Sequence, residues 1–452
     1  MPEQKPPVVK AREAALRALV RVEQDGAYLN LALPSLLQAL PAAEKALAVR
    51  LAKGTVQRLN TLDWALNLYC HRPVNSLTPW IRNLLRLGAY QILYLDRIPD
   101  YAVVDQSVKL ARRFGHRGVA GMVNAVLRRL AQNSGCLPWP DRNRQSLEYL
   151  SLRHSHPQWM VSRALNRFGS YIAEKWCQAN NEQPMASIRP NCLRTTVEKL
   201  AGDLKLEGYE TVESLWVPGL LRVKGPASPA AARAFKNGLF TIQGESSALV
   251  APLLGLSPGD TVVDLCSAPG GKSTHLAELT EDRGLIYAVE VHHNRLRLVE
   301  KAARRLGLRS IRPVLADGRN IDSGKITTPD AVLVDAPCSG LGVIRRLPEI
   351  KWRRKEEELV TFQELQLELL AAAARLLPVG GKLLYAVCTT EPEETVAVVE
   401  KFNNRWTGFE LEPLQLLLPP LLRAAQDDPD KVVLWPHRHS LDGFFMAMWR
   451  KK

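Results

Sequence analysis

The sequence predicts an α/β protein in three parts: an all-α region over residues 1–135, a small α+β region over 141–235 and an α/β domain over 236–452. Two observations predict this division. Apolar residues recur at helical spacing in the first region, whereas short apolar runs alternate with amphipathic helical stretches in the last. Successive strand–helix–strand units of the second kind form a doubly wound, largely parallel sheet.

The N-terminal region consists of stretches with the three- and four-residue apolar spacing of amphipathic helices. These stretches cover residues 11–22, 44–56, 59–69, 81–95, 103–114 and 120–130. A turn-forming segment at 133–140 ends the helical region. The α+β region that follows mixes helical pieces with short β-like runs. The helical pieces lie at 157–168, 171–180 and 196–206, and the β-like runs lie at 186–189 and 219–223.

The C-terminal domain alternates predicted strands with predicted helices. The strands are expected at 261–266, 285–290, 311–315, 331–335, 382–388 and 443–449. The helices are expected at 272–281, 294–306, 359–377 and 393–404. Because the strands are apolar on both faces, the sequence predicts a parallel sheet that is covered by helices on both sides.

Bulk composition favours a nucleic-acid partner. The chain of 452 residues carries a formal net charge of +14, and so basic a protein is expected to bind a polyanion such as RNA. Its seven cysteines include no CxxC pair, which argues against a disulfide framework and a zinc finger. We find no signal peptide and no run of about 18 apolar residues. We therefore expect a cytoplasmic monomer that binds neither a membrane nor a metal ion.

A glycine-rich turn at 266–272 follows the first strand of the α/β domain. Its Gly-Lys-Ser triplet resembles part of a phosphate-binding P-loop, but that motif needs a glycine five positions before Gly271, where Cys266 stands. A glycine turn also lets the backbone approach a nucleoside cofactor closely. Glu290 ends the second strand, where an acid suits ribose hydroxyls, and Asp317 follows the third, where it would face an adenine. NAD remains an alternative, although the GxGxxG pattern is absent.

Two cysteines stand where predicted strands give way to loops. Cys338 lies in the Asp-Ala-Pro-Cys-Ser-Gly segment 335–340, and Cys388 ends the apolar run 383–387. In open α/β sheets, ligands bind at this edge. A thiol there can act as a nucleophile, transfer a proton or pack in the core. The residues alone do not say which cysteine attacks, although the Pro-Cys dipeptide resembles that of DNA cytosine methyltransferases, a resemblance that would imply Cys338.

These motifs, in this order and spacing over 236–450, resemble those of the RNA cytosine-C5 methyltransferase family. Segments 348–352 and 442–445 are also similar to motifs of that family, and the N-terminal region resembles a NusB-like domain at Asp63, 87–91 and 123–128. The resemblance implies a Rossmann-like class I methyltransferase domain and S-adenosylmethionine as cofactor. It implies that the cofactor is bound by Cys266, Ser267, Ala268, Pro269, Gly270, Gly271, Lys272, Glu290, Asp317 and Asp335.

The same resemblance implies methylation of C5 of a cytosine in small-subunit (16S) ribosomal RNA, through a covalent adduct between cysteine and C6. In that scheme Cys388 attacks, Cys338 assists release of the methylated product, and Asp335 hydrogen-bonds the N3/N4 edge of the base. Two alternatives are a transfer RNA target and, from another class, a non-catalytic RNA-binding factor for ribosome assembly.

Two basic clusters are expected to contact the RNA backbone. The first surrounds an aromatic residue near Cys338 and consists of Arg345, Arg346, Lys351, Trp352, Arg353, Arg354 and Lys355. The second lies in the helical region and consists of Arg112, Arg113, His116, Arg117, Arg128 and Arg129. For the first cluster, a solvated helix start is the alternative.

Overall fold

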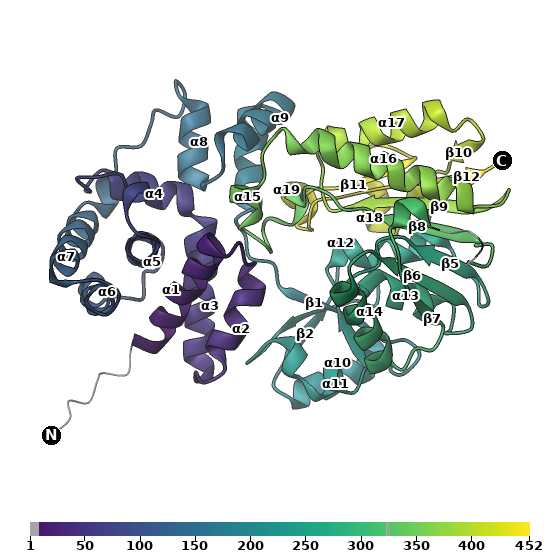
Figure 1. Cartoon of the computed structure of the whole chain (residues 1–452), viewed down its shortest axis with the longest axis horizontal. Coiled ribbons are helices and arrows are strands. Elements are labelled where there is room, and N and C mark those ends of the chain that lie inside the picture. Colours follow the sequence, from purple (N-terminus) through teal and green to yellow (C-terminus); the bar gives the residue numbers. More distant parts are fainter. Residues whose placement is uncertain (1–8, 322–323, 325) are drawn as a thin grey trace. The chain divides into compact units, whose positions relative to one another are not determined.

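The computed structural model describes residues 9–321, 324 and 326–452. The chain divides into two compact units. One unit holds the described residues up to Glu182 together with Ile344–Arg353, and the other holds Gln183–Val343 and Arg354–Lys452 (Figure 1). The prediction of three domains with boundaries at 135, 141 and 236 therefore stays a prediction.

The first unit is helical. Its helices are α1 (Val9–Gln24), α2 (Leu29–Leu37), α3 (Ala42–Gln57), α4 (Leu59–Asn67), α5 (Pro79–Tyr94), α6 (Asp100–Phe114), α7 (Arg117–Gln132), α8 (Ser146–His154), α9 (Gln158–Ala179) and the short α15 (Ile350–Arg353). Helix α5 packs against α1, α3, α4, α6 and α7, so it is the central helix of this unit. Three helices of this unit were not predicted from the sequence: α8, α15 and α2, which contains Pro34.

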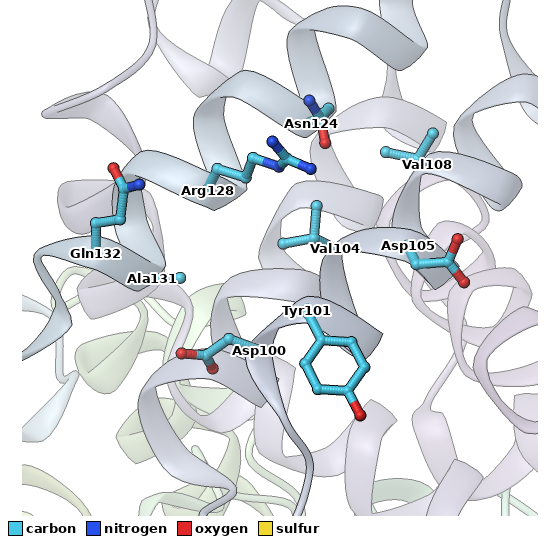
Figure 2. Close-up of a pocket in the computed structure, with 9 residues that line it drawn as sticks. All are labelled: Asp100, Tyr101, Val104, Asp105, Val108, Asn124, Arg128, Ala131 and Gln132. Atoms are coloured by element: carbon cyan, nitrogen blue, oxygen red, sulfur yellow. The ribbon is translucent and has the colours of Figure 1, made fainter.

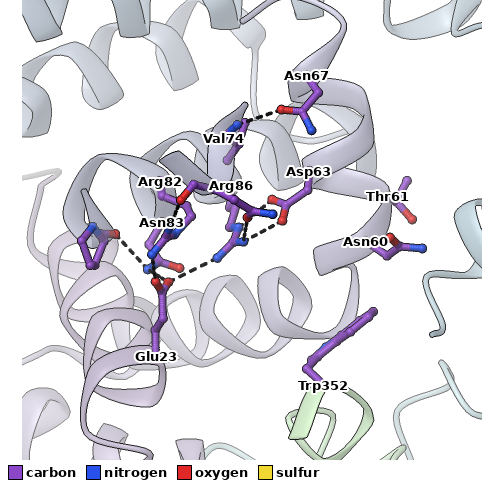
Figure 3. Close-up of polar contacts among 12 residues, drawn as sticks. Glu23, Asn60, Thr61, Asp63, Asn67, Val74, Arg82, Asn83, Arg86 and Trp352 are labelled. Atoms are coloured by element: carbon purple, nitrogen blue, oxygen red, sulfur yellow. Dashed lines mark hydrogen bonds and ion pairs between the residues drawn. The ribbon is translucent and has the colours of Figure 1, made fainter. Parts of the chain in front are cut away.

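An ion-pair network in this unit connects three helices. Figure 3 shows Arg86 of α5 between Asp63 of α4 and Glu23 of α1. The guanidinium of Arg86 makes two hydrogen bonds of 2.6 Å to the Asp63 carboxylate, and it lies 3.3 Å from Glu23. Asp63, one of the residues that carry the NusB resemblance, thus holds α4 against α5.

The second unit begins with a four-stranded antiparallel sheet in the order β2-β3-β1-β4. Its elements are β1 (Ala186–Pro190), α10 (Val197–Leu206), β2 (Glu210–Glu213), β3 (Leu221–Lys224), α11 (Arg233–Lys236) and β4 (Phe240–Ile242). The predicted α+β character of this region is confirmed, although β2 and β4 were not predicted.

The larger sheet has the order β10-β12-β9-β8-β5-β6-β7, with β11 beside β12. Its strands are β5 (Thr261–Asp264), β6 (Leu285–Glu290), β7 (Ile311–Leu315), β8 (Ala331–Asp335), β9 (Lys382–Val387), β10 (Phe409–Leu411), β11 (Lys431–Leu434) and β12 (Phe444–Lys451). Strands β9, β8, β5, β6 and β7 are parallel, whereas β10, β11 and β12 are joined by antiparallel pairing. The predicted parallel core is confirmed, and β10 and β11 were not predicted.

Helices cover both faces of this sheet. The principal helices are α12 (Glu245–Ala248), α13 (Gly271–Leu279), α14 (His293–Leu306), α16 (Glu358–Leu376), α17 (Val396–Arg405), α18 (Pro420–Ala424) and α19 (Pro436–His439). Val262 packs in the same apolar core as Leu276 of α13, and the next residue, Val263, packs with Leu370 of α16. Successive residues of one strand thus point to opposite faces, which is the doubly wound arrangement that the sequence predicts.

The strand order brings the predicted motifs to one edge. Strands β9, β8, β5 and β6 are neighbours, so their carboxyl ends place Cys388, Asp335, Cys266 and Glu290 in adjacent positions. Among the residues that the structure describes, no helix is long and apolar enough to cross a membrane.

Candidate active site

The glycine-rich turn closes tightly between β5 and α13. Gly270 has a φ of +104°, and a Cβ atom at this position would lie 3.0 Å from the Cα of Val299. The amide of Gly270 donates to the carbonyl of Ser267 at 2.8 Å, and the amide of Ser267 donates to the carbonyl of Val289 at 2.9 Å. Only glycine combines this backbone conformation with so close an approach to α14.

Two acids follow the strands beside this turn. Glu290 is buried at the end of β6, where its carboxylate accepts a hydrogen bond of 3.0 Å from the amide of His292. Asp317 is more exposed, and it accepts hydrogen bonds from the backbone and the guanidinium of Arg319. These hydrogen bonds lower the pKa of Asp317. The two acids stand in the predicted strand order, and their roles toward a cofactor remain predictions.

Asp264 is a residue of this site that sequence reasoning missed. It is the last residue of β5 and is fully buried, and the Ser273 hydroxyl donates a hydrogen bond of 2.6 Å to its carboxylate. Burial raises the pKa of Asp264 to about 7. The signal in the sequence was an acid inside an apolar strand that leads directly into the glycine turn.

The residues at this edge fit a nucleoside cofactor. The Ser267 hydroxyl is buried and has no hydrogen-bond partner among the residues that the structure describes, so it is available to a ligand in the turn. The buried Glu290 stands across the turn, and Gly270 leaves no side chain in the way. Burial raises the pKa of the Cys266 thiol well above that of a free cysteine, which disfavours its thiolate.

Asp335 ends β8 and pairs with the lysine of the glycine turn. The Nζ atom of Lys272 lies 2.5 Å from a carboxylate oxygen of Asp335, and its ammonium group lies 5.5 Å from the centre of the Phe444 ring. The side chain of Lys272 is largely buried, whereas that of Asp335 is partly open. The ion pair thus links the turn to the acid that the sequence predicts beside the reactive thiols.

The two cysteines lie in contact. The Sγ atoms of Cys338 and Cys388 are 3.3 Å apart, which is within hydrogen-bonding distance for thiols. The two loops are also joined through their backbones, since the amide of Gly342 donates to the carbonyl of Cys388 at 3.0 Å. The hydrogen bond with Cys388 and burial raise the pKa of Cys338 well above that of a free cysteine.

Two further residues hold the loop of Cys338. Glu394 is fully buried, and its Oε2 atom accepts hydrogen bonds from the amide of Ser339 at 2.8 Å and from Nε2 of Gln366 at 3.0 Å. Neither Glu394 nor Gln366 was predicted, because neither belongs to the cysteine motifs and both fall in predicted helices.

The predicted RNA contact at Lys351 is wrong. Lys351 is fully buried in the helical unit, and its ammonium group donates hydrogen bonds to the carbonyls of Gln57 and Ser155 and to the side chain of Asn181, at 2.8–3.1 Å. With every donor used inside the protein, it cannot hold an RNA phosphate.

The neighbours of Lys351 are also engaged within the helical unit. The indole of Trp352, visible in Figure 3, donates a hydrogen bond of 2.6 Å to the carbonyl of Val56. Arg353 donates to the carbonyl of Ala27 at 2.5 Å, and the buried Arg345 lies 3.7 Å from Glu182. These contacts engage part of each side chain within the helical unit, and RNA binding by Arg345, Trp352 and Arg353 stays a prediction. For Arg346, RNA binding stays a prediction.

The second basic cluster is more exposed. Arg112 and Arg128 are exposed on α6 and α7, and Arg128 lines a pocket together with Tyr101 (Figure 2). Arg113 is also exposed but forms an ion pair of 2.7 Å with Glu13. The RNA-binding role of Arg112, Arg113 and Arg128 remains a prediction.

The parallel sheet is doubly wound, with a glycine turn after its first strand and an acid at the end of its second. The next strands end at the reactive side chains. This combination defines a nucleoside-cofactor enzyme of the methyltransferase class. The family model for "16S rRNA methyltransferase RsmB/F" matches residues 251–450. The NusB family model matches residues 9–132, and that of the RsmF/B-like ferredoxin-like domain matches residues 156–229.

Known proteins agree with these matches. The probable ribosomal RNA small subunit methyltransferase B of Bacillus subtilis is 36% identical over 446 residues, covering 98% of each chain. The crystal structure of PH0851 is 29% identical, with a TM-score of 0.84 over 99% of this chain and 100% of that one. A methyltransferase homolog from Pyrococcus horikoshii is 28% identical, with a TM-score of 0.58 over 68% of this chain and 99% of that one. The chain belongs to the 16S rRNA methyltransferase RsmB/F family, and its cofactor is S-adenosylmethionine.

Proposed function

We propose that this protein methylates C5 of a cytosine in 16S ribosomal RNA through a covalent bond between Cys388 and C6 of the base. The observation that carries the proposal is the 3.3 Å contact between the two thiols beside Asp335. The printed name of the Bacillus subtilis relative supports the choice of small-subunit ribosomal RNA.

Cytosine C5 is a poor nucleophile, and a thiolate that adds to C6 makes it enamine-like. Splitting one difficult step into easier ones is the gain of covalent catalysis. The thiol pair supports Cys388 as the attacking group, because burial and the contact with Cys388 raise the pKa of Cys338 and make Cys338 the poorer source of a thiolate. S-adenosylmethionine supplies an electrophilic methyl group to the activated C5.

The same pair supports Cys338 as the base that releases the product. The largest contribution that raises the pKa of Cys338 is its hydrogen bond with Cys388, and the charge of Cys388 adds to it. Both contributions vanish once Cys388 is bonded to C6. Cys338 then becomes more acidic, loses its proton to solvent and can accept the proton of C5. In this proposal, attack by Cys388 on C6 thus lowers the pKa of Cys338 and allows Cys338 to act as the base.

Asp335 is proposed to recognise the base. Its carboxylate is partly open at the end of β8, opposite Ala386 of the strand that leads to Cys388, and it pairs with Lys272. In that position it can hydrogen-bond the N3/N4 edge of cytosine and stabilise the adduct. We propose that the turn 266–272, Glu290 and Asp317 bind the cofactor.

The helical N-terminal domain, over residues 1–135, is proposed to bind RNA through exposed cations such as Arg112 and Arg128. Residues 141–235 form the intermediate domain and residues 236–452 the catalytic one. RNA binding through these cations depends on phosphate charge and carries no base specificity.

We expect the protein to act as a monomer in the cytoplasm.

The function is tested by methyl transfer from labelled S-adenosylmethionine to 16S ribosomal RNA isolated from a strain that lacks the protein. Label is expected on C5 of one cytosine and absent from transfer RNA under the same conditions. Label on transfer RNA alone would show that transfer RNA is the substrate in place of ribosomal RNA. No label on either RNA would overturn the proposal.

A further inference from the structure

Glu394 connects the loop of Cys338 to the strand of Cys388. Its carboxylate accepts the amide hydrogen of Ser339, the residue after Cys338, at 2.8 Å. Its own backbone carbonyl accepts a hydrogen bond of 2.7 Å from the hydroxyl of Tyr385, a fully buried residue of β9. Glu394 is therefore anchored to the strand that carries one thiol and holds the loop that carries the other.

Gln366 of α16 strengthens this connection from the other side. Its Nε2 atom donates hydrogen bonds to Oε2 of Glu394 at 3.0 Å and to the carbonyl of Pro337 at 3.1 Å. The residues on both sides of Cys338 are thus fixed, Pro337 by Gln366 and Ser339 by Glu394. Both side chains are buried, so water does not compete for these hydrogen bonds.

A carboxylate is a costly group at this place. Burial raises the pKa of Glu394, which shows that its ionised form is poorly solvated. The carboxylate is held where two donors, one of them the amide next to Cys338, converge on a single oxygen. Its position is therefore better explained by the loop that it orders than by stability.

We propose that Glu394 is a positioning residue for product release, which holds Cys338 beside Cys388. This inference rests on the proposed function. In the step concerned, the thiolate of Cys338 takes the proton from C5, the C5–C6 double bond re-forms, and the electron pair of the Cys388–C6 bond returns to Cys388 as thiolate. The proton stands on Cys338 until solvent takes it. Attack by Cys388 does not require the Ser339 contact, because Cys388 directly follows β9.

The experiment compares Glu394→Ala with Glu394→Gln in the full-length protein, using 16S ribosomal RNA and S-adenosylmethionine. The alanine variant leaves the Ser339 amide without its acceptor, and the loss of a buried hydrogen bond should slow release about tenfold. The covalent protein–RNA complex should then accumulate, while the affinity for the cofactor changes by less than about twofold. The glutamine variant keeps an oxygen acceptor and should recover most of the turnover.

Gln363 offers a matched control on the same helix. It is equally buried, and its amide donates to the carbonyl of Glu393 at 2.6 Å without touching the cysteine loops. Gln363→Leu should change thermal stability without accumulating the complex, whereas Gln366→Leu should accumulate it. Gln366→Leu also serves as the test if Glu394→Ala does not fold.

Two results would overturn the inference. Turnover of Glu394→Ala at the wild-type rate would remove any positioning role. Slower formation of the complex, rather than its accumulation, would place Glu394 in attack instead of release. Failure of the proposed function looks different, because wild type and Cys338→Ala would then form no complex at all.

Discussion

The Sγ atom of Cys338 lies 3.3 Å from that of Cys388, although the two residues are 50 positions apart in the chain. Strands β8 and β9 are direct neighbours, with Asp335 opposite Ala386, and this register brings the two loops together. The contact makes the thiols a coupled pair, so the protonation of one depends on the state of the other.

The Lys272–Asp335 ion pair should be required for methyl transfer. Lys272→Met removes the cation 2.5 Å from the carboxylate, and the loss of such a charge-assisted contact should lower kcat/KM by about tenfold or more. Rates of labelled methyl transfer measure the effect. Lys301→Met, at an exposed position on α14, is the control and should leave the rate unchanged. Equal rates for both variants would contradict a role for the pair.

The glycine turn should not accept a side chain at Gly270. Gly270→Ala combines a φ of +104° with a Cβ atom 3.0 Å from Val299, which should cost about 1–2 kcal/mol and weaken cofactor binding. Calorimetric titration with S-adenosylmethionine checks this. At Gly202 in α10 a Cβ would meet open space, so Gly202→Ala should bind the cofactor as wild type does. Unchanged affinity for Gly270→Ala would mean that the cofactor does not use this turn.

RNA affinity should depend on Arg128 and be independent of Lys351. Arg128 is exposed on α7, and loss of one phosphate contact should lower the slope of log K against log salt by about one. Lys351 makes its hydrogen bonds inside the helical unit, so Lys351→Met should leave the slope as it is. Filter binding over a range of salt concentrations tests both variants. The opposite pattern would restore Lys351 as an RNA contact.

Burial of Lys351 should make stability depend on pH. Burial, and then the charge of Arg58, lower the pKa of Lys351 well below that of an exposed lysine. The unfolded chain therefore keeps this proton to a higher pH than the folded one. The contribution of Lys351 to the free energy of unfolding should therefore rise with pH, from the lowered pKa of the folded state up to about pH 10.4, the ordinary pKa of lysine. The difference in Tm between wild type and Lys351→Met should shift in favour of wild type as pH is raised. A constant difference would contradict this expectation.

The catalytic sheet was predictable because its signal is local. Strands β6, β7 and β8 have the predicted bounds, since each is a short run rich in β-branched and other apolar residues. Strands β10 and β11 were missed, since they pair antiparallel with β12 and carry only part of that apolar pattern.

The failure at Lys351 has a physical cause. A run of lysine, tryptophan and arginine looks like a solvated or RNA-facing surface, because charged side chains are seldom buried. Burial of Lys351 depends on three oxygen acceptors from Gln57, Ser155 and Asn181, which are distant in sequence. Glu394 escaped notice for the same reason, since its partners Ser339 and Gln366 come together only in the fold.

The most direct test of the central claim is the covalent complex that each cysteine variant forms with unmodified 16S ribosomal RNA in the presence of S-adenosylmethionine, measured on denaturing gels. Cys388→Ala should form no complex, and Cys338→Ala should accumulate one, because attack proceeds and release does not. The double variant should form none. A complex that accumulates in Cys388→Ala and is absent from Cys338→Ala would contradict the roles assigned here to the two thiols.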